Sequence, residues 1–134
     1  TDASSSPSVA LHHYNLGSAL QDSGKFPEAV SCYRTAISIN PSYHEAFFNL
    51  GSALQEMGDP EAAKAAYEDA IRVKPGNAAA YYNLAYVLQD GGDLAGAVRC
   101  FEAAVKYDPM DVDIHINLGN AYRDQGELQK AVKA

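Results

Sequence analysis

Four variants of one seven-residue motif decide the fold of this chain. They read YNLGSAL at residues 14–20, FNLGSAL at 48–54, YNLAYVL at 82–88 and INLGNAY at 116–122. Successive copies start 34 residues apart. Self-similarity at a fixed period of this length indicates supersecondary units that stack because none can bury its apolar face alone.

Outside the motif, each unit repeats small and aromatic residues in the same register. Alanine recurs at Ala29, Ala63, Ala97 and Ala131, an aromatic ring follows at Tyr33, Tyr67 and Phe101, and a second alanine follows at Ala36, Ala70 and Ala104. The complete units close with Pro41, Pro75 and Pro109. The chain therefore contains three full repeats, at residues 10–43, 44–77 and 78–111, and a partial fourth at 112–134.

Each unit has the start and stop signals of two helices. The first helix should end in a left-handed residue at Gly24, Gly58, Gly92 and Gly126. Asp59 and Asp93 are expected N-caps of the second helix, and the closing prolines end it. Close approach of the two helices is allowed by the small residues Gly17, Gly51, Ala85 and Gly119. The sequence therefore predicts an all-α fold of antiparallel helix pairs.

The full pattern, aromatic-x-x-Leu-Gly-x-x-Leu/Tyr followed by Ala-x-x-x-aromatic-x-x-Ala and Pro, resembles the tetratricopeptide repeat. The resemblance covers residues 10–134. Its first position, often Trp in the family, is here His13, Phe47, Tyr81 and His115. The resemblance implies an α-α superhelix, a right-handed solenoid whose first helices line a concave groove, and a role in protein binding.

The composition fits one soluble domain, with 134 residues, 47% of them apolar and 20% charged. No apolar run approaches the ~18 residues of a membrane span, so no membrane partner is expected. Residues 1–9 (TDASSSPSV) are small and polar, and we interpret them as a flexible leader before the repeat domain at 10–134. The chain begins without methionine and stops inside the expected second helix of the fourth repeat. We interpret it as a piece of a longer protein, whose own activity stays open.

The net charge limits the classes of partner that the chain can bind, and the cysteines indicate its cellular compartment. A net charge of −7 and a pI near 4.9 argue against nucleic acid, which needs clustered Lys and Arg, and favour neutral or basic partners. Cys32 and Cys100 occupy the same position two units apart, too far for the ~7 Å Cα separation that a disulfide tolerates. Free thiols indicate an intracellular protein, cytoplasmic or nuclear.

Neither a metal site nor a catalytic centre is expected. The four histidines lack the spacing and the cysteine partners of a zinc site. The sequence has no Gly-rich phosphate loop, and no nucleophile stands with a base and an orienting group. We therefore expect a non-enzymatic module without cofactors.

One side of each first helix should face away from the second helix. At ~100° per residue, Gly17 and Leu20 point toward the partner helix while Asn15 lies on the opposite side. The resemblance places that opposite side in the groove, and we call it the asparagine stripe. It comprises Leu11, Asn15, Ser18 and Asp22; Glu45, Asn49, Ser52 and Glu56; Ala79, Asn83, Tyr86 and Asp90; and Asp113, Asn117, Asn120 and Asp124.

Asparagine is the only residue of the stripe that is the same in all four units. A carboxamide has an acceptor oxygen and a donor nitrogen, so it can pair with the C=O and N–H of an extended peptide without reading side chains. Each such bond contributes on the order of 0.5–1.5 kcal/mol net. The predicted peptide-binding residues are Asn15, Asn49, Asn83 and Asn117, with Ser18, Ser52, Tyr86 and Asn120 beside them. Two alternatives stay open: duplication copied a neutral asparagine, or the asparagines hydrogen-bond between neighbouring first helices.

Acidic residues form a second recurring position, at Asp22, Glu56, Asp90 and Asp124 in the last turn of each first helix. There an acidic side chain meets the negative end of the helix dipole, at a cost of ~0.3–1 kcal/mol. Four repeated unfavourable charges suggest a use in attracting segments that carry Lys or Arg, or that are rich in Ser and Thr. The alternative is a solvated helix end whose carboxylate hydrogen-bonds the glycine turn.

The asparagine stripe also resembles that of the superhelix of O-linked N-acetylglucosamine transferases. This suggests an alternative function, the substrate-recognition part of a protein O-glycosyltransferase. Chaperone-tail binders instead carry a Lys-Asn-Asn-Lys-Arg clamp, and no acidic C-terminal tail is expected as ligand because the clamp positions here contain no cation. They hold Tyr14, Ser18, Asn49, Ala79 and Asn83. A further alternative is a homo-oligomer that associates through an open apolar face at the C-terminal end.

Overall fold

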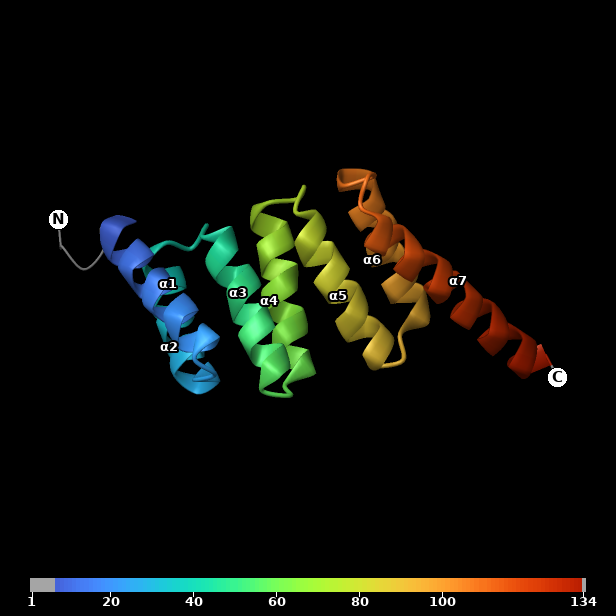
Figure 1. The fold of residues 1–134 in the computed structure, drawn as a ribbon, viewed down its shortest axis with the longest axis horizontal. Coiled ribbons are helices and arrows are strands. Elements are labelled where there is room, and N and C mark those ends of the chain that lie inside the picture. The colour runs from blue at the N-terminus through green and yellow to red at the C-terminus, as the bar shows by residue number, and fades with distance from the viewer. Residues whose placement is uncertain (1–6, 134) are drawn as a thin grey trace. The chain divides into compact units, whose positions relative to one another are not determined.

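The computed structural model describes residues 7–133 as backbone and residues 7–130 with their side chains. Within these residues the chain is all-α, as expected, with seven helices and no strand (Figure 1). The helices are α1 (Pro7–Asp22), α2 (Phe26–Ile39), α3 (His44–Glu56), α4 (Pro60–Val73), α5 (Ala78–Asp90), α6 (Leu94–Tyr107) and α7 (Val112–Lys133). They form two compact units, α1 to α4 and α5 to α7.

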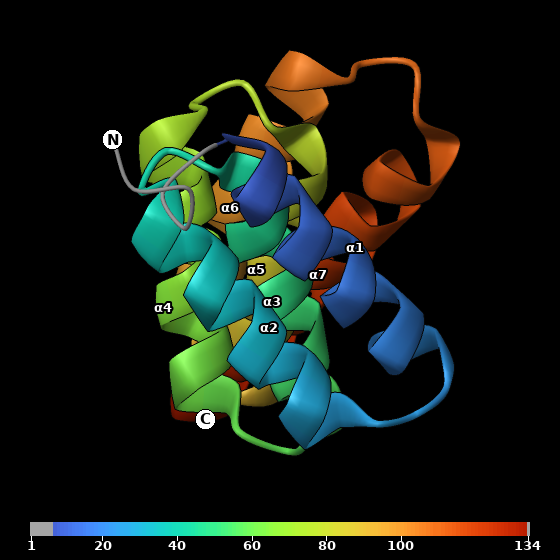
Figure 2. The ribbon, with the colours of Figure 1, turned by 90° about the vertical axis from the view of Figure 1, so that its left-hand side faces the viewer.

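The first unit consists of two helix pairs. α1 packs on α2 and α3 packs on α4, and α2 also contacts α3 (Figure 2 views the pair α1 and α2 from its outer side). Each second helix supplies an aromatic ring between two alanines, and all of these side chains are fully buried: Ala29, Tyr33 and Ala36 from α2, and Ala63, Tyr67 and Ala70 from α4. The repeated Ala-x-x-x-aromatic-x-x-Ala pattern therefore forms the core.

The second unit has one pair, α5 and α6, with α7 packed against α6. Its core contains Ala85 from α5, Ala97, Val98 and Phe101 from α6, and Ala121 from α7. The aromatic ring of α6 thus takes the place that Tyr33 and Tyr67 have in the first unit.

The expected turn and cap residues are confirmed in the first three repeats. Gly24, Gly58 and Gly92 have φ values of 77°, 76° and 89°, in the left-handed region that favours glycine. The carboxylates of Asp59 and Asp93 accept hydrogen bonds from backbone N–H groups of the first turns of α4 and α6. α2, α4 and α6 end two residues before the closing prolines.

The first helix begins earlier than the sequence suggested. α1 starts at Pro7, so Pro7, Ser8 and Val9 are helical rather than part of a flexible leader. Proline is favourable at the first helical position, where its missing N–H is not needed. The rest of the expected leader, residues 1–6, lies outside the described residues.

The expectation that Gly126 ends a helix was wrong. α7 runs from Val112 to Lys133 and passes through Gly126, which is not among the glycines with positive φ. Continuing the helix satisfies the backbone hydrogen bonds locally, and a glycine in a helix costs only about 1 kcal/mol relative to alanine. The Ala131 side chain, expected in the second helix of the fourth repeat, lies outside the described side chains.

Candidate functional site

Two of the four asparagines link neighbouring first helices. Asn49 Nδ2 on α3 donates a hydrogen bond of 3.0 Å to the Tyr14 hydroxyl on α1. Asn117 Nδ2 on α7 donates one of 2.8 Å to the Tyr82 hydroxyl on α5, and another of 2.9 Å to the carbonyl oxygen of Asp113. The interhelical bond that the sequence left open as an alternative is therefore present in both units.

These bonds use the nitrogen side of each amide. Among the hydrogen bonds made by the described residues, none is accepted by the carbonyl oxygen of Asn49 or Asn117. Both side chains are half-buried, as is Asn83, while Asn15 is exposed. The tyrosine therefore fixes the orientation of the amide through its nitrogen, and the acceptor capacity of the oxygen is not used by these bonds.

A glutamine on α1 connects Ser52 of the stripe to the core of the first unit. The Tyr33 hydroxyl donates to Gln21 Oε1 at 2.7 Å, and Gln21 Nε2 donates to Ser52 Oγ at 3.0 Å. The Tyr67 hydroxyl donates to Gln55 Oε1 in the same way. This glutamine position had no predicted role, although glutamine recurs with the period at Gln21, Gln55 and Gln89. In each of these three repeats it directly precedes the acidic residue of the stripe.

Tyr86, the aromatic member of the stripe, belongs to a cluster in the second unit. Its ring lies 5.0 Å from that of Tyr82 and 5.8 Å from that of Phe101, and the two tyrosine hydroxyls are 3.2 Å apart. Burial raises the pKa of Tyr82 to about 12, and the hydrogen bond with Tyr86 adds to the effect. Tyr86 is half-buried, so its ring can pack in this cluster and still contact a ligand.

The acidic residues of the stripe are accessible. Asp22, Glu56 and Asp90 are exposed and Asp124 is half-buried, with its carboxylate 4.0 Å from Arg123 Nε. Within the described part of the chain, no hydrogen bond joins any of them to a glycine turn. Their charge is therefore available to a ligand.

Within each unit, the residues of the stripe lie on two first helices that a tyrosine–asparagine bond joins. In the first unit α1 and α3 carry Asn15, Ser18, Asp22, Asn49, Ser52 and Glu56. In the second unit α5 and α7 carry Asn83, Tyr86, Asp90, Asn117, Asn120 and Asp124. The tyrosine bonds to Asn49 and Asn117 join the two helices in each case.

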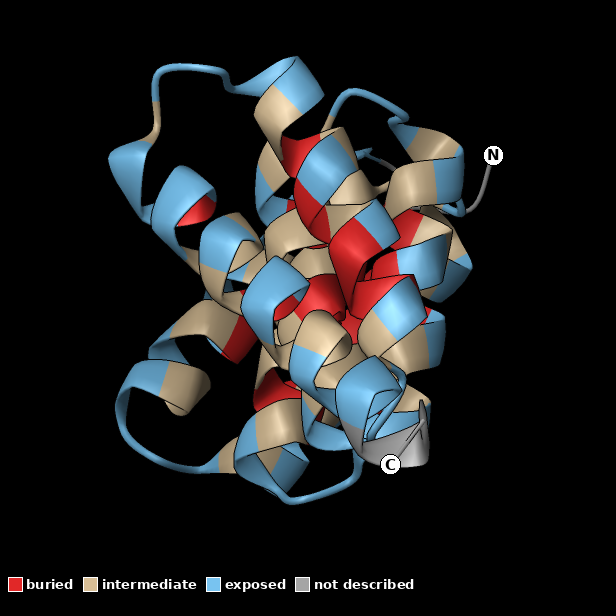
Figure 3. Cartoon of the chain, turned by 90° about the vertical axis from the view of Figure 1, so that its right-hand side faces the viewer, coloured by how far each residue is buried: buried red, intermediate tan, exposed pale blue. Residues whose placement is uncertain are grey.

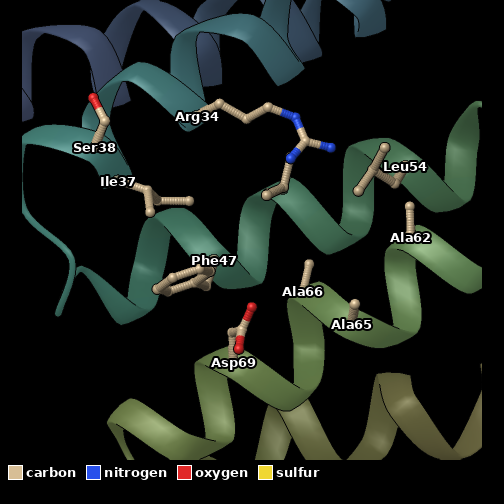
Figure 4. Close-up of a pocket in the computed structure, with 10 residues that line it drawn as sticks. Arg34, Ile37, Ser38, Phe47, Leu54, Ala62, Ala65, Ala66 and Asp69 are labelled. Atoms are coloured by element: carbon tan, nitrogen blue, oxygen red, sulfur yellow. The ribbon is translucent and has the colours of Figure 1, made fainter.

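A pocket of about 410 Å³ lies on a different side of α3 (Figure 4). Arg34 and Ile37 of α2, Phe47 and Leu54 of α3, and Asp69 of α4 contribute to its lining. Leu54 occupies the repeat position of Leu20, which the sequence places toward the partner helix, so no pattern distinguished this pocket from the core.

Metal-binding clusters and membrane-spanning helices are absent among the described residues. No group of three or more His, Cys, Asp or Glu side chains is arranged to hold a metal ion there. No helix within residues 7–133 has the length and apolar character to cross a membrane. Cys32 and Cys100 are free thiols, as expected.

Family models match most of the chain. The TPR repeat model matches residues 17–58, and the tetratricopeptide repeat model matches residues 48–98 and 82–134. A search of curated proteins finds no match.

Solved structures share the fold. The crystal structure of MamA is 27% identical, with a TM-score of 0.84 over 92% of this chain and 72% of that one. The TPR domain of Sgt2 from Aspergillus fumigatus is 22% identical, with a TM-score of 0.83 over 90% of this chain and 82% of that one. The first TPR domain of Spaghetti (RPAP3), bound to the HSP90 peptide SRMEEVD, is 19% identical, with a TM-score of 0.83 over 87% of this chain and 93% of that one.

Proposed function

Since this chain belongs to the tetratricopeptide repeat family and is a protein-interaction scaffold, we propose that it binds an extended peptide along the asparagine stripe. In the first unit the amides of Asn15 and Asn49 bind the peptide backbone, and in the second unit those of Asn83 and Asn117 do so. Ser18 and Ser52 in the first unit, and Tyr86 and Asn120 in the second, contact the peptide beside these amides. The chain itself has no catalytic role in this function.

The observation that carries the proposal is the hydrogen bond from the asparagine amide of one first helix to the tyrosine hydroxyl of the preceding first helix. Tyr14 and Tyr82 hold the amides of Asn49 and Asn117 before any ligand arrives. A group that is already ordered loses little conformational entropy on binding, so more of its hydrogen-bond energy appears as affinity. The free amide oxygen is the acceptor that a peptide N–H requires.

Charge indicates which peptides are favoured. The stripe carries the exposed carboxylates of Asp22, Glu56 and Asp90, and it contains no Lys or Arg. The peptide bound to the RPAP3 domain contains two Glu and one Asp. Such an acidic segment would be repelled here, whereas a basic segment would be attracted and a neutral or Ser/Thr-rich segment would not be repelled.

Two alternatives fit the same fold. An asparagine in every repeat favours the substrate-recognition part of a protein O-glycosyltransferase, in which Ser/Thr-rich peptides would be the preferred ligands. The exposed side chains of α7, Ile116 and Tyr122 among them, favour self-association. Concentration-independent monomer mass in light scattering would count against self-association.

The decisive experiment is a peptide-array screen of the chain and of a variant with all four asparagines changed to alanine. We expect binding of neutral and basic peptides by the chain and a loss of at least tenfold in the variant, about 1.4 kcal/mol. Gln129→Ala, an exposed amide outside the stripe, is the control.

A second variant separates binding from stability. Tyr14→Phe with Tyr82→Phe removes the interhelical hydrogen bonds but keeps every asparagine. If the amides serve only to join helices, the alanine and phenylalanine variants will lose stability alike and bind peptides like the unchanged chain. That result would refute the proposal. Weaker binding at raised salt would support the role of the carboxylates.

A further inference from the structure

The pocket beside α3 combines an apolar floor with one charged group on each side. Phe47, Leu50 and Leu54 of α3 form the floor, and all three are buried. Arg34 of α2 lines one side and Asp69 of α4 lines the other. The volume of about 410 Å³ lies within the ~300–1,000 Å³ of small-molecule sites, where a few polar groups orient a ligand between apolar walls.

The small side chains of α4 leave this pocket open. Ala62, Ala65 and Ala66 line it, and Figure 4 shows them and Arg34 on opposite sides of α3. The same repeat positions hold Glu28, Ser31 and Cys32 in α2, and Gly96, Arg99 and Cys100 in α6. Among the second helices that the structure describes, α4 alone has a methyl group at all three positions.

Arg34 departs from the repeat at the same place. Its position is occupied by Glu68 in α4 and by Glu102 in α6. Within the described part of the chain, the Arg34 side chain makes no hydrogen bond or ion pair. Asp69 Oδ1 lies 3.5 Å from Arg72 Nη2. Of the two charged groups that line the pocket, the carboxylate therefore has a partner and the guanidinium has none.

We propose that this pocket binds a small amphipathic carboxylate, with its aliphatic body on the floor of α3 and its carboxylate paired with Arg34. A guanidinium group presents its N–H donors in a planar fork that matches the two oxygens of a carboxylate. A cation beside buried apolar side chains thus selects a ligand with one anionic and one apolar end. No residue of the asparagine stripe lines the pocket, so this is a second site.

The charges of the pocket disfavour other head groups on the same body. A cationic ligand would be repelled by Arg34 and would compete with Arg72 for Asp69. A neutral ligand would gain the apolar contacts alone. A carboxylate gains an ion pair in addition, and added salt should weaken that pair because Arg34 is exposed.

A series of ligands with one body and three head groups tests the proposal. Octanoate, octanol and octylammonium are each titrated against the chain by isothermal titration calorimetry and by amide NMR shifts. We expect saturable binding of octanoate, at least threefold tighter than binding of the other two, with shifts centred on Ile37, Leu54 and Ala65. A merely apolar pocket would favour octanol, because moving a carboxylate out of water costs free energy.

Two variants separate the ion pair from the apolar contacts. Arg34→Gln should weaken octanoate binding at least threefold and leave octanol binding unchanged. Ala65→Leu places a larger side chain in the pocket and should weaken the binding of both ligands at least tenfold. Both positions are exposed and the buried residues, red in Figure 3, are unchanged, so the helical circular dichroism should be kept.

Matched controls lie on α6, outside the pocket. Arg99→Gln removes an exposed arginine, and Ala95→Leu enlarges an exposed alanine. Neither should change the affinity for octanoate. An equal loss in Arg34→Gln and Arg99→Gln would show that only the net charge of the chain matters, and it would overturn the proposal.

Three further results would also overturn it. The first is absence of saturable octanoate binding, and the second is octanol or octylammonium binding as tightly as octanoate. The third is octanoate binding that Ala65→Leu does not weaken. A short blocked peptide with Phe beside Glu tests the other occupant: if it shifts the amides of the pocket and octanoate does not, the pocket holds a side chain of a protein partner and the proposal is wrong.

Discussion

The amide of Asn117 donates to the hydroxyl of Tyr82 at 2.8 Å, and the same relationship joins Asn49 to Tyr14 at 3.0 Å. In both units the pair connects two first helices that are not neighbours in the chain. A hydrogen bond that recurs at the same positions belongs to the repeat itself. It makes the asparagine part of the helix packing as well as a candidate ligand contact.

This relationship predicts a measurable coupling. We expect Tyr82→Phe and Asn117→Ala each to lower the free energy of unfolding by about 1 kcal/mol, since a half-buried hydrogen bond is worth roughly that amount. In a double-mutant cycle the coupling energy should be about 0.5–1.5 kcal/mol. Urea unfolding measures all four corners of the cycle. Tyr107→Phe serves as the control. If the losses caused by Tyr82→Phe and Asn117→Ala are additive, the hydrogen bond between the two side chains contributes nothing to stability.

Two glycines at equivalent positions should respond oppositely to alanine. At Gly51 a Cβ would meet three atoms of the Tyr67 ring at 2.6–2.9 Å, so Gly51→Ala should destabilise the first unit by roughly 1–3 kcal/mol. At Gly119 the space is open, so Gly119→Ala should stabilise α7 by up to about 1 kcal/mol. Urea unfolding of both variants tests the pair. Equal effects would contradict the difference in packing.

Stability should fall at high pH because of buried tyrosines. Burial raises the pKa of Tyr33 from 10.0 to about 12, so the folded chain holds this proton more tightly than the unfolded chain. Its contribution is fully present below pH 10 and is lost as the pH rises through 12. Because Tyr33 is fully buried, the loss should be on the order of 2 kcal/mol.

The measurement combines unfolding curves with tyrosinate absorbance across this pH range. Tyr33→Phe should show a shallower decline between pH 10 and pH 12 than the unchanged chain. An identical decline in the two proteins would mean that other groups cause it.

The sequence period was sufficient to predict the fold. The glycine turns at Gly24, Gly58 and Gly92 followed from it because the local backbone demands a left-handed residue there. The partners of the asparagines did not follow. Tyr14 is next to Asn15 in sequence but bonds to Asn49, and that choice depends on how two helices pack rather than on any local pattern. The role of Gln21 was missed for the same reason, since it requires the Tyr33 hydroxyl from another helix.

Gly126 shows where a repeated residue does not repeat its structure. The period assigns it the role of Gly92, but Gly92 has a φ of 89° and Gly126 continues α7. We expect Gly92→Ala to cost roughly 1–2 kcal/mol, because a side chain is strained in the left-handed region. Gly126→Ala should instead raise stability by up to about 1 kcal/mol and raise the helical circular dichroism signal. If Gly126→Ala is as costly as Gly92→Ala, the helix ends at Gly126 in solution and the segment after it folds back as a second helix.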